Sequence, residues 1–123
     1  MGLINAMLGN ASDVDGDEVA QEIAPILAPE ETVEAAFKMV RDLYVFTSKR
    51  LILVDKQGMT GRKVEYRSIP YRAITQFTVE NAGTFDADSE MRIWISGQPE
   101  PLVRELKRGA NVEAIQKALA SIL

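Results

Sequence analysis

The chain contains no cysteine and no histidine among its 123 residues. Without cysteine it can form no disulfide, thiolate metal site or thiol nucleophile. Without histidine it lacks the commonest general base and the commonest metal ligand, so a hydrolase triad of the usual type cannot be built. Paired carboxylates remain, but the acids gather in the first 34 residues and in Asp86–Glu90, where solvation explains them better. We therefore expect no enzymatic activity, no cofactor and no metal.

Long hydrophobic runs are also missing. The longest span four or five residues, against the roughly 20 that a bilayer-spanning helix needs. No basic segment precedes the first apolar one, as it would in a secretory signal. The sequence predicts a cytoplasmic protein. A chain of 123 residues with 46% hydrophobic content is long enough for one domain with its own core.

Basic residues are absent from residues 1–34, which carry eight acids, whereas residues 35–123 carry fourteen bases and ten acids. We divide the chain into an acidic N-terminal helical arm, residues 1–29, and a domain, residues 30–123. The arm can stay solvated, or contact its own domain, a neighbouring subunit or a basic partner. Nucleic acid is not an expected partner, because the net charge is −4 and no aromatic residues interleave with the bases.

Two short helices are predicted in the arm. The first has apolar residues at helical spacing, namely Leu3, Ile4, Met7 and Leu8. Isolated helices below about 12 residues are marginal, so this stripe needs a surface to lie on, which can belong to another chain. The second helix begins at Asp15 or Asp17 and has Val19, Ile23, Ile26 and Leu27 on its apolar face. The acids around Gly16 lack the spacing of a calcium loop.

From Thr32 onward the apolar residues alternate, as they do in strands. Seven strands are predicted, at about Thr32–Val40, Leu43–Phe46, Leu51–Val54, Val64–Arg67, Ile74–Val79, Met91–Ser96 and Leu102–Leu106. Strict alternation places Val33 on the same face as Ala35, Phe37 and Met39. Ser68–Pro70 is expected to break the fourth strand, and Tyr71–Ala73 to form one helical turn.

The last part of the chain returns to helical spacing. Asn111 is expected to cap a helix whose apolar face contains Val112, Ile115, Leu119 and Ile122. Among the aromatic residues, Phe37, Phe46, Tyr66 and Phe77 are predicted to lie in the core.

Several motifs resemble the bacterial pleckstrin-homology-like family over roughly residues 30–123. They are Tyr44–Asp55, Ser68–Tyr71, Ile93–Ile95 and the amphipathic C-terminal helix. The resemblance implies a curled seven-stranded antiparallel sheet, or partly open barrel, capped by the C-terminal helix. It also implies a tendency to homo-oligomers, ring-shaped in some members, and no established enzymatic activity. The phosphoinositide motif of eukaryotic relatives is not matched, because Asp42 follows Arg41 where an anionic headgroup would be repelled, so lipid binding is not inferred by analogy.

Trp94 is expected to face outward, because Ile93 and Ile95 occupy the inward face of their strand. A large aromatic residue on a sheet surface usually has a cover, and for Trp94 we expect either the N-terminal helix of the same chain or another subunit. Tryptophan is also enriched at interface hot spots. The candidate oligomer interface therefore consists of Leu3, Ile4, Met7, Leu8 and Trp94. Our first hypothesis is a non-enzymatic domain that acts by self-association and by docking a protein or peptide.

A second hypothesis comes from the seven bases between Lys49 and Arg72. If Lys49, Arg50, Arg62 and Lys63 converge on one edge, they form an anion patch that can hold a phosphate, the surface of an anionic lipid membrane or the acidic arm of a neighbouring chain. The competing interpretation is that these side chains are ordinary solvated strand ends and turns.

Overall fold

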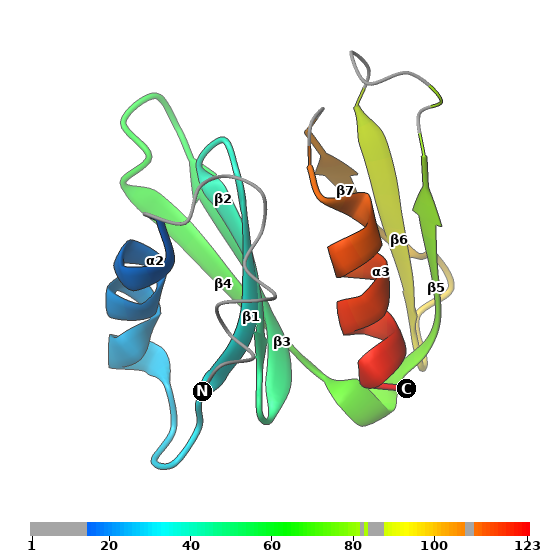
Figure 1. The fold of residues 1–123 in the computed structure, drawn as a ribbon, viewed down its shortest axis with the longest axis horizontal. Coiled ribbons are helices and arrows are strands. Elements are labelled where there is room, and N and C mark those ends of the chain that lie inside the picture. The colour runs from blue at the N-terminus through cyan, green and yellow to red at the C-terminus, as the bar shows by residue number, and fades with distance from the viewer. Residues whose placement is uncertain (1–14, 82, 84–87, 108–109) are drawn as a thin grey trace.

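The computed structural model describes residues 15–81, 83, 88–107 and 110–123 (Figure 1). The elements follow in the order α2 (Asp15–Ile23), η1 (Ala24–Ile26), β1 (Val33–Met39), β2 (Asp42–Thr47), β3 (Arg50–Gln57), β4 (Lys63–Pro70), η2 (Tyr71–Ala73), β5 (Ile74–Glu80), β6 (Ser89–Ile95), β7 (Leu102–Leu106) and α3 (Val112–Ser121). Both η elements are single 3-10 turns. No helix within these residues is long and apolar enough to cross a membrane.

The seven strands form two antiparallel sheets. Sheet A has the order β1-β2-β3-β4, and sheet B has the order β5-β6-β7. The predicted strands and C-terminal helix are confirmed, but the strands do not form one continuous sheet. The predicted cap of α3 is also confirmed, because the Asn111 side chain accepts a hydrogen bond from the Ala114 N–H at 3.0 Å.

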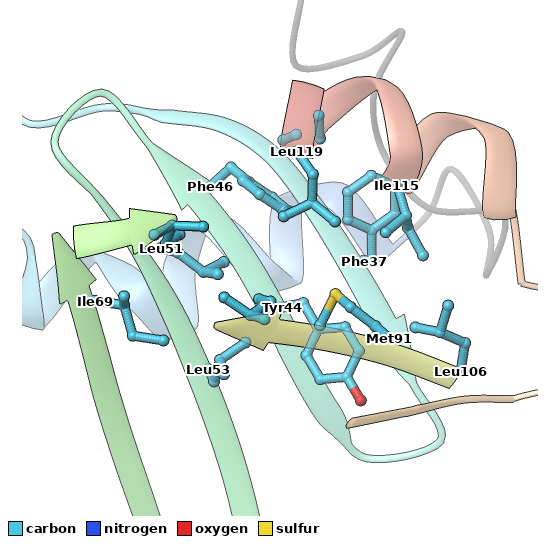
Figure 2. Close-up of a cluster of buried hydrophobic side chains, with 14 of the residues drawn as sticks. Phe37, Tyr44, Phe46, Leu51, Leu53, Ile69, Met91, Leu106, Ile115 and Leu119 are labelled. Atoms are coloured by element: carbon cyan, nitrogen blue, oxygen red, sulfur yellow. The ribbon is translucent and has the colours of Figure 1, made fainter. Parts of the chain in front are cut away.

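The main core is formed by side chains from sheet A, sheet B and α3, which pack against one another. Phe37 and Phe46 of sheet A meet edge to face, with ring centroids 6.0 Å apart. Figure 2 shows these rings beside Ile115 and Leu119 of α3, with Met91 and Leu106 of sheet B close by. Fully burying one side chain of this size contributes roughly 1.5–3 kcal/mol. Helix α3 is therefore part of the core and closes the opening between the sheets.

A second core lies on the other face of sheet A, under α2 (Figure 1). Val19 and Ile23 of α2 are buried there, as the sequence predicted, and they pack in one cluster with Val45 and Ile52. Both faces of β2 and β3 are therefore covered, which explains why these strands have continuous apolar runs.

Val33 also belongs to this second cluster, and not to the face of Ala35 and Phe37. The prediction of strict alternation in β1 is wrong at this point. The pairing of β1 with β2 has a register shift between Val33 and Ala35, and such a shift turns the preceding side chain to the opposite face.

Strand β4 departs from the prediction in two ways. It continues to Pro70, although Ser68–Pro70 was expected to end it. A proline is tolerated because β4 is an edge strand, where its missing N–H costs no ladder hydrogen bond. The prediction that Tyr66 lies in the core is also wrong, since this residue is 42% exposed. Phe37 and Phe46 are buried as predicted, and Phe77 packs partly buried against the main core.

Candidate functional site

Trp94 lies on the outer face of sheet B. Its neighbours Ile93 and Ile95 pack in or against the main core, whereas Trp94 belongs to neither core cluster of the described residues. Its backbone pairs with Gln76, and the Thr75 hydroxyl donates to its carbonyl oxygen at 3.3 Å. The side chain is only partly buried. The orientation inferred from alternation therefore agrees with the structure.

Other residues share this outer face. Arg92 lies two positions before Trp94 on β6 and forms an ion pair with Glu90. Val103 of β7 stands opposite Arg92 and is 40% exposed. Within the described part of the chain, helix α2 covers the far face of sheet A and α3 lies between the sheets (Figure 1). The outer face of sheet B, which we define by Gln76, Arg92, Trp94 and Val103, therefore has no helix over it in the residues described.

The remaining members of the candidate interface lie outside the described residues. These are Leu3, Ile4, Met7 and Leu8. Their contact with Trp94 stays a prediction.

Arg50 of the candidate anion patch is bound to a buried carboxylate. Its Nε donates to Glu31 Oε2 at 2.9 Å, and its Nη2 donates to Glu31 Oε1 at 3.0 Å and to the Ile26 carbonyl at 2.7 Å. The Thr47 hydroxyl donates to the same Glu31 Oε2 at 2.5 Å, and the Ala28 N–H donates to Oε1 at 2.8 Å. The Glu31 side chain is fully buried. We call Glu31, Thr47 and Arg50 the Glu31 cluster.

The Glu31 cluster joins the end of the arm to the turn between β2 and β3. Hydrogen bonds from Arg50, with further ones from Thr47 and Ala28, lower the pKa of Glu31 to about 2 even though burial acts in the opposite direction. The carboxylate in turn raises the pKa of Arg50. The charge of Arg50 is therefore already neutralised by Glu31 within the fold. The sequence analysis had instead proposed that Arg50 helps to hold an external anion.

The four cations of the candidate anion patch do not converge on one edge, and this geometric part of the prediction is wrong. Lys49 and Arg50 lie at the turn between β2 and β3, whereas Arg62 and Lys63 lie at the turn between β3 and β4. Along β3, Arg50 pairs with Pro70 and Gln57 pairs with Lys63. At about 3.4 Å per residue these two ends are roughly 24 Å apart. Anion binding at either end stays a prediction.

Two exposed apolar residues near Arg62 were not recognised in the sequence. Met59 is 102% exposed at the turn between β3 and β4, and Val40 is 74% exposed at the turn between β1 and β2. The sequence could have indicated this exposure. Val40 lies in a two-residue turn and Met59 in a glycine-bracketed loop, and side chains in such connections are usually exposed. The alternation pattern had instead assigned Val40 to the first strand.

Among the surface hollows lined by described residues, three border elements named above. One of about 380 Å³ borders Arg50 and Ser68, and one of about 310 Å³ lies between the β1–β2 turn and β7. A third of about 510 Å³ lies between β5 and α3, beside Val79 and Gln116. The described residues contain no group of three or more Asp and Glu side chains placed to hold a metal ion.

The arrangement of the elements defines the class of protein. Two packed antiparallel sheets of four and three strands, with a C-terminal helix in the opening between them, form a small pleckstrin-homology-like domain. The structure is similar to that of the pleckstrin homology domain from Shewanella amazonensis SB2B, with a TM-score of 0.81 and 63% identity over 92% of this chain and 91% of that one. The chain belongs to the Bacterial PH domain family, which matches residues 2–123.

Two further relatives support this assignment. A DUF1696 family protein with a pleckstrin-homology domain from Shewanella loihica PV-4 has a TM-score of 0.74 and 57% identity, over 86% of this chain and 91% of that one. The uncharacterized protein YjqA of Bacillus subtilis (strain 168) is 56% identical over 123 residues, covering 99% of this chain and 98% of the relative. The family resemblance inferred from the sequence is therefore confirmed.

Proposed function

We propose that this domain acts by self-association and by docking a protein or peptide, with the outer face of sheet B as the contact surface. The observation that carries the proposal is an asymmetry between the two sheets. Sheet A has a buried cluster on each face, whereas sheet B contributes to a cluster on one face only within the described residues. The other face holds Trp94 and the exposed Val103. Tryptophan is among the residues most enriched at interface hot spots.

The occupant we propose for this face is the apolar stripe of the N-terminal segment from a neighbouring copy. That stripe consists of Leu3, Ile4, Met7 and Leu8, and a helix of this length needs a surface to be stable. A contact in which one surface meets a different surface of the next copy is heterologous, and it closes into a ring when the rotation between copies allows. A protein or peptide partner with a similar apolar stripe competes for the same face.

Trp94 provides a direct test because it is the only tryptophan in the chain. Sedimentation velocity and tryptophan emission are measured over a dilution series of the intact chain. We expect an oligomer that dissociates on dilution, with a shift of the emission to longer wavelength as Trp94 becomes hydrated. A monomer at all micromolar concentrations contradicts self-association. An oligomer whose emission stays constant through dissociation places the contact away from Trp94.

Double substitutions in the arm test whether its apolar stripe, and not the rest of the segment, is responsible for association. Met7→Ser with Leu8→Ser is expected to weaken association, because two apolar side chains that cover Trp94 are lost. Asn5→Ser with Asn10→Ser is the matched control and is expected to leave association unchanged. A synthetic peptide of residues 1–14, added to a chain that lacks residues 2–9, is expected to shift Trp94 emission to shorter wavelength. If the peptide leaves the emission unchanged, the proposed occupant is wrong.

A further inference from the structure

The hollow of about 380 Å³ beside the Glu31 cluster combines apolar walls with a few polar groups. Sites for small ligands measure about 300–1,000 Å³ and are lined in this way. The apolar wall of the hollow consists of Ile26, Ala28 and Pro70. Its polar lining, besides Glu31, consists of Lys49, Arg50 and Ser68. These side chains come from the end of the arm, the β2–β3 turn and the edge strand β4.

The buried carboxylate of Glu31 is not available to a ligand. Its side chain is fully buried, and its two oxygens accept four hydrogen bonds, from Ala28, Thr47 and Arg50. An ionised carboxylate has about four lone-pair sites, so its capacity to accept is used within the fold. Among the described residues that line the hollow, Glu31 is the only acid. The side chains that a ligand can reach there are therefore donors.

Three side chains keep a donor for a ligand. Arg50 has five N–H groups, and four of them donate within the fold, to Glu31, to Ser68 and to the Ile26 carbonyl. The fifth is on Nη1, the nitrogen that donates to Ser68 Oγ at 2.8 Å. Because that oxygen accepts from Arg50, the hydroxyl proton of Ser68 remains to donate. Lys49 is exposed, and its ammonium group forms no ion pair within the described residues.

We propose that this hollow binds an aliphatic monocarboxylate. The carboxylate accepts hydrogen bonds from Lys49, Arg50 and Ser68, and the aliphatic part lies against Ile26 and Pro70. Apolar groups gain by leaving water at such a wall, and charge-assisted hydrogen bonds are stronger than neutral ones. The same chemistry is offered by a free short-chain acid and by the C-terminus of a peptide that ends in an apolar residue. The proposal does not depend on self-association, which uses the outer face of sheet B.

The charge of the lining selects the class of anion. Glu31 and Arg50 form an ion pair with each other, so Lys49 supplies the one uncompensated charge among the residues that line the hollow. One positive charge matches a monovalent carboxylate better than a phosphate dianion, and phosphate has no apolar part for the wall. Arg50 contributes an N–H and not its net charge. Its pairing with Glu31 therefore holds this donor in place and is compatible with binding.

Nuclear magnetic resonance titration of the isotope-labelled intact chain tests the proposal, with sodium hexanoate as the probe. We expect saturable shifts of the backbone amide signals of Lys49, Arg50 and Ser68. Butanoate should bind about tenfold more weakly, because two fewer CH₂ groups leave water. Hexan-1-ol, which lacks the charge, and inorganic phosphate, which lacks the chain, should both bind more weakly than hexanoate. The absence of saturable shifts with hexanoate overturns the proposal, as does equal or tighter binding of hexan-1-ol or of phosphate.

A further probe distinguishes the two sources of the carboxylate. Acetyl-glycyl-leucine carries a free C-terminal carboxylate beside an apolar side chain, and its C-terminal amide is the uncharged control. Tighter binding of this peptide than of hexanoate assigns the hollow to peptide C-termini, and tighter binding of hexanoate assigns it to free acids. Equal binding of the peptide and its amide contradicts recognition of the carboxylate.

Variants at exposed positions test the residues without disturbing the core. Lys49→Gln is expected to weaken hexanoate binding about tenfold, because the unpaired charge is lost. Lys63→Gln is the matched control, since Lys63 is also exposed but lies at the other end of β3. Equal effects of the two variants, or no effect of Lys49→Gln, refute the site.

Ser68→Leu places a larger side chain in the hollow and is expected to abolish hexanoate binding. Ser68 is exposed on an edge strand, so the variant should unfold at nearly the same temperature as the natural chain. Loss of binding by a variant of unchanged stability supports the assigned hollow. Undiminished binding by Ser68→Leu places the hexanoate elsewhere and overturns the proposal.

Discussion

Replacing Glu31 by Gln removes the charge of the buried carboxylate in the Glu31 cluster and keeps its shape. A folded-state pKa of about 2, against an ordinary value of 4.5, corresponds to about 3 kcal/mol of unfolding free energy at neutral pH. The substitution also leaves the Arg50 guanidinium, whose side chain is 25% exposed, without its anionic partner. We therefore expect Glu31→Gln to lower the free energy of unfolding at pH 7 by about 3 kcal/mol.

The pH dependence gives this prediction its specific signature. Because the pKa of Glu31 is lower in the folded chain, its stabilising contribution is fully present above pH 4.5 and is lost as the pH falls toward 2. The natural chain and Glu31→Gln should therefore differ by about 3 kcal/mol at pH 7 and by less than about 1 kcal/mol near pH 2. Urea unfolding followed by circular dichroism over this pH range measures the difference.

Glu30→Gln is the matched control, since it removes the same charge from an exposed neighbouring residue. Its effect is expected to be below about 0.5 kcal/mol. Arg50→Met added to Glu31→Gln should recover part of the lost stability, because no guanidinium is then left without a partner. A difference between Glu31→Gln and the natural chain that stays constant from pH 7 to pH 2 would refute the assignment of the effect to the Glu31 carboxylate.

Three further predictions concern the fold. Phe37→Ala should cost about 3–5 kcal/mol in urea unfolding, because Phe37 is fully buried between the sheets; a cost below about 1 kcal/mol would contradict the assigned core. Tyr44→Phe removes the hydroxyl that donates to the Glu105 carbonyl at 2.6 Å and should cost about 1–2 kcal/mol, whereas Tyr66→Phe on the exposed edge should be nearly neutral. Asn111→Ala should lower the free energy of unfolding by about 1 kcal/mol through loss of the α3 cap, and Asn111→Asp should retain it; equal losses in both variants would show that the cap hydrogen bond is not the cause.

Much of the fold could be predicted from the sequence because its signals are local. Alternation located the strands, and the three- and four-residue spacing after Asn111 located α3 together with its cap. The turn at Tyr71–Ala73 followed from Pro70 and the residues after it. Val33 was assigned to the wrong face because a single register shift changes which side chains point inward, and composition does not reveal such a shift.

The candidate site was harder to predict because it depends on contacts between distant parts of the chain. Arg50 was counted as a free cation, whereas its partner Glu31 lies 19 residues earlier, and no local pattern joins the two. Tyr66 was assigned to the core because alternation identifies a face but not whether another element covers it. The separation of Lys49 from Arg62 follows from strand pairing, since the antiparallel order places successive turns at opposite ends of a sheet.

The difference between the two sheets has a consequence for how such a domain can diversify. In sheet A, residues 43–47 of β2 and 51–54 of β3 are buried, so substitutions there affect stability. On the outer face of sheet B, Gln76, Arg92 and Val103 lie outside both cores of the described residues. Under the proposed function, substitutions at these positions change what the protein recognises and leave the packing of both cores intact. This face is therefore the natural place to graft a new binding specificity onto the scaffold.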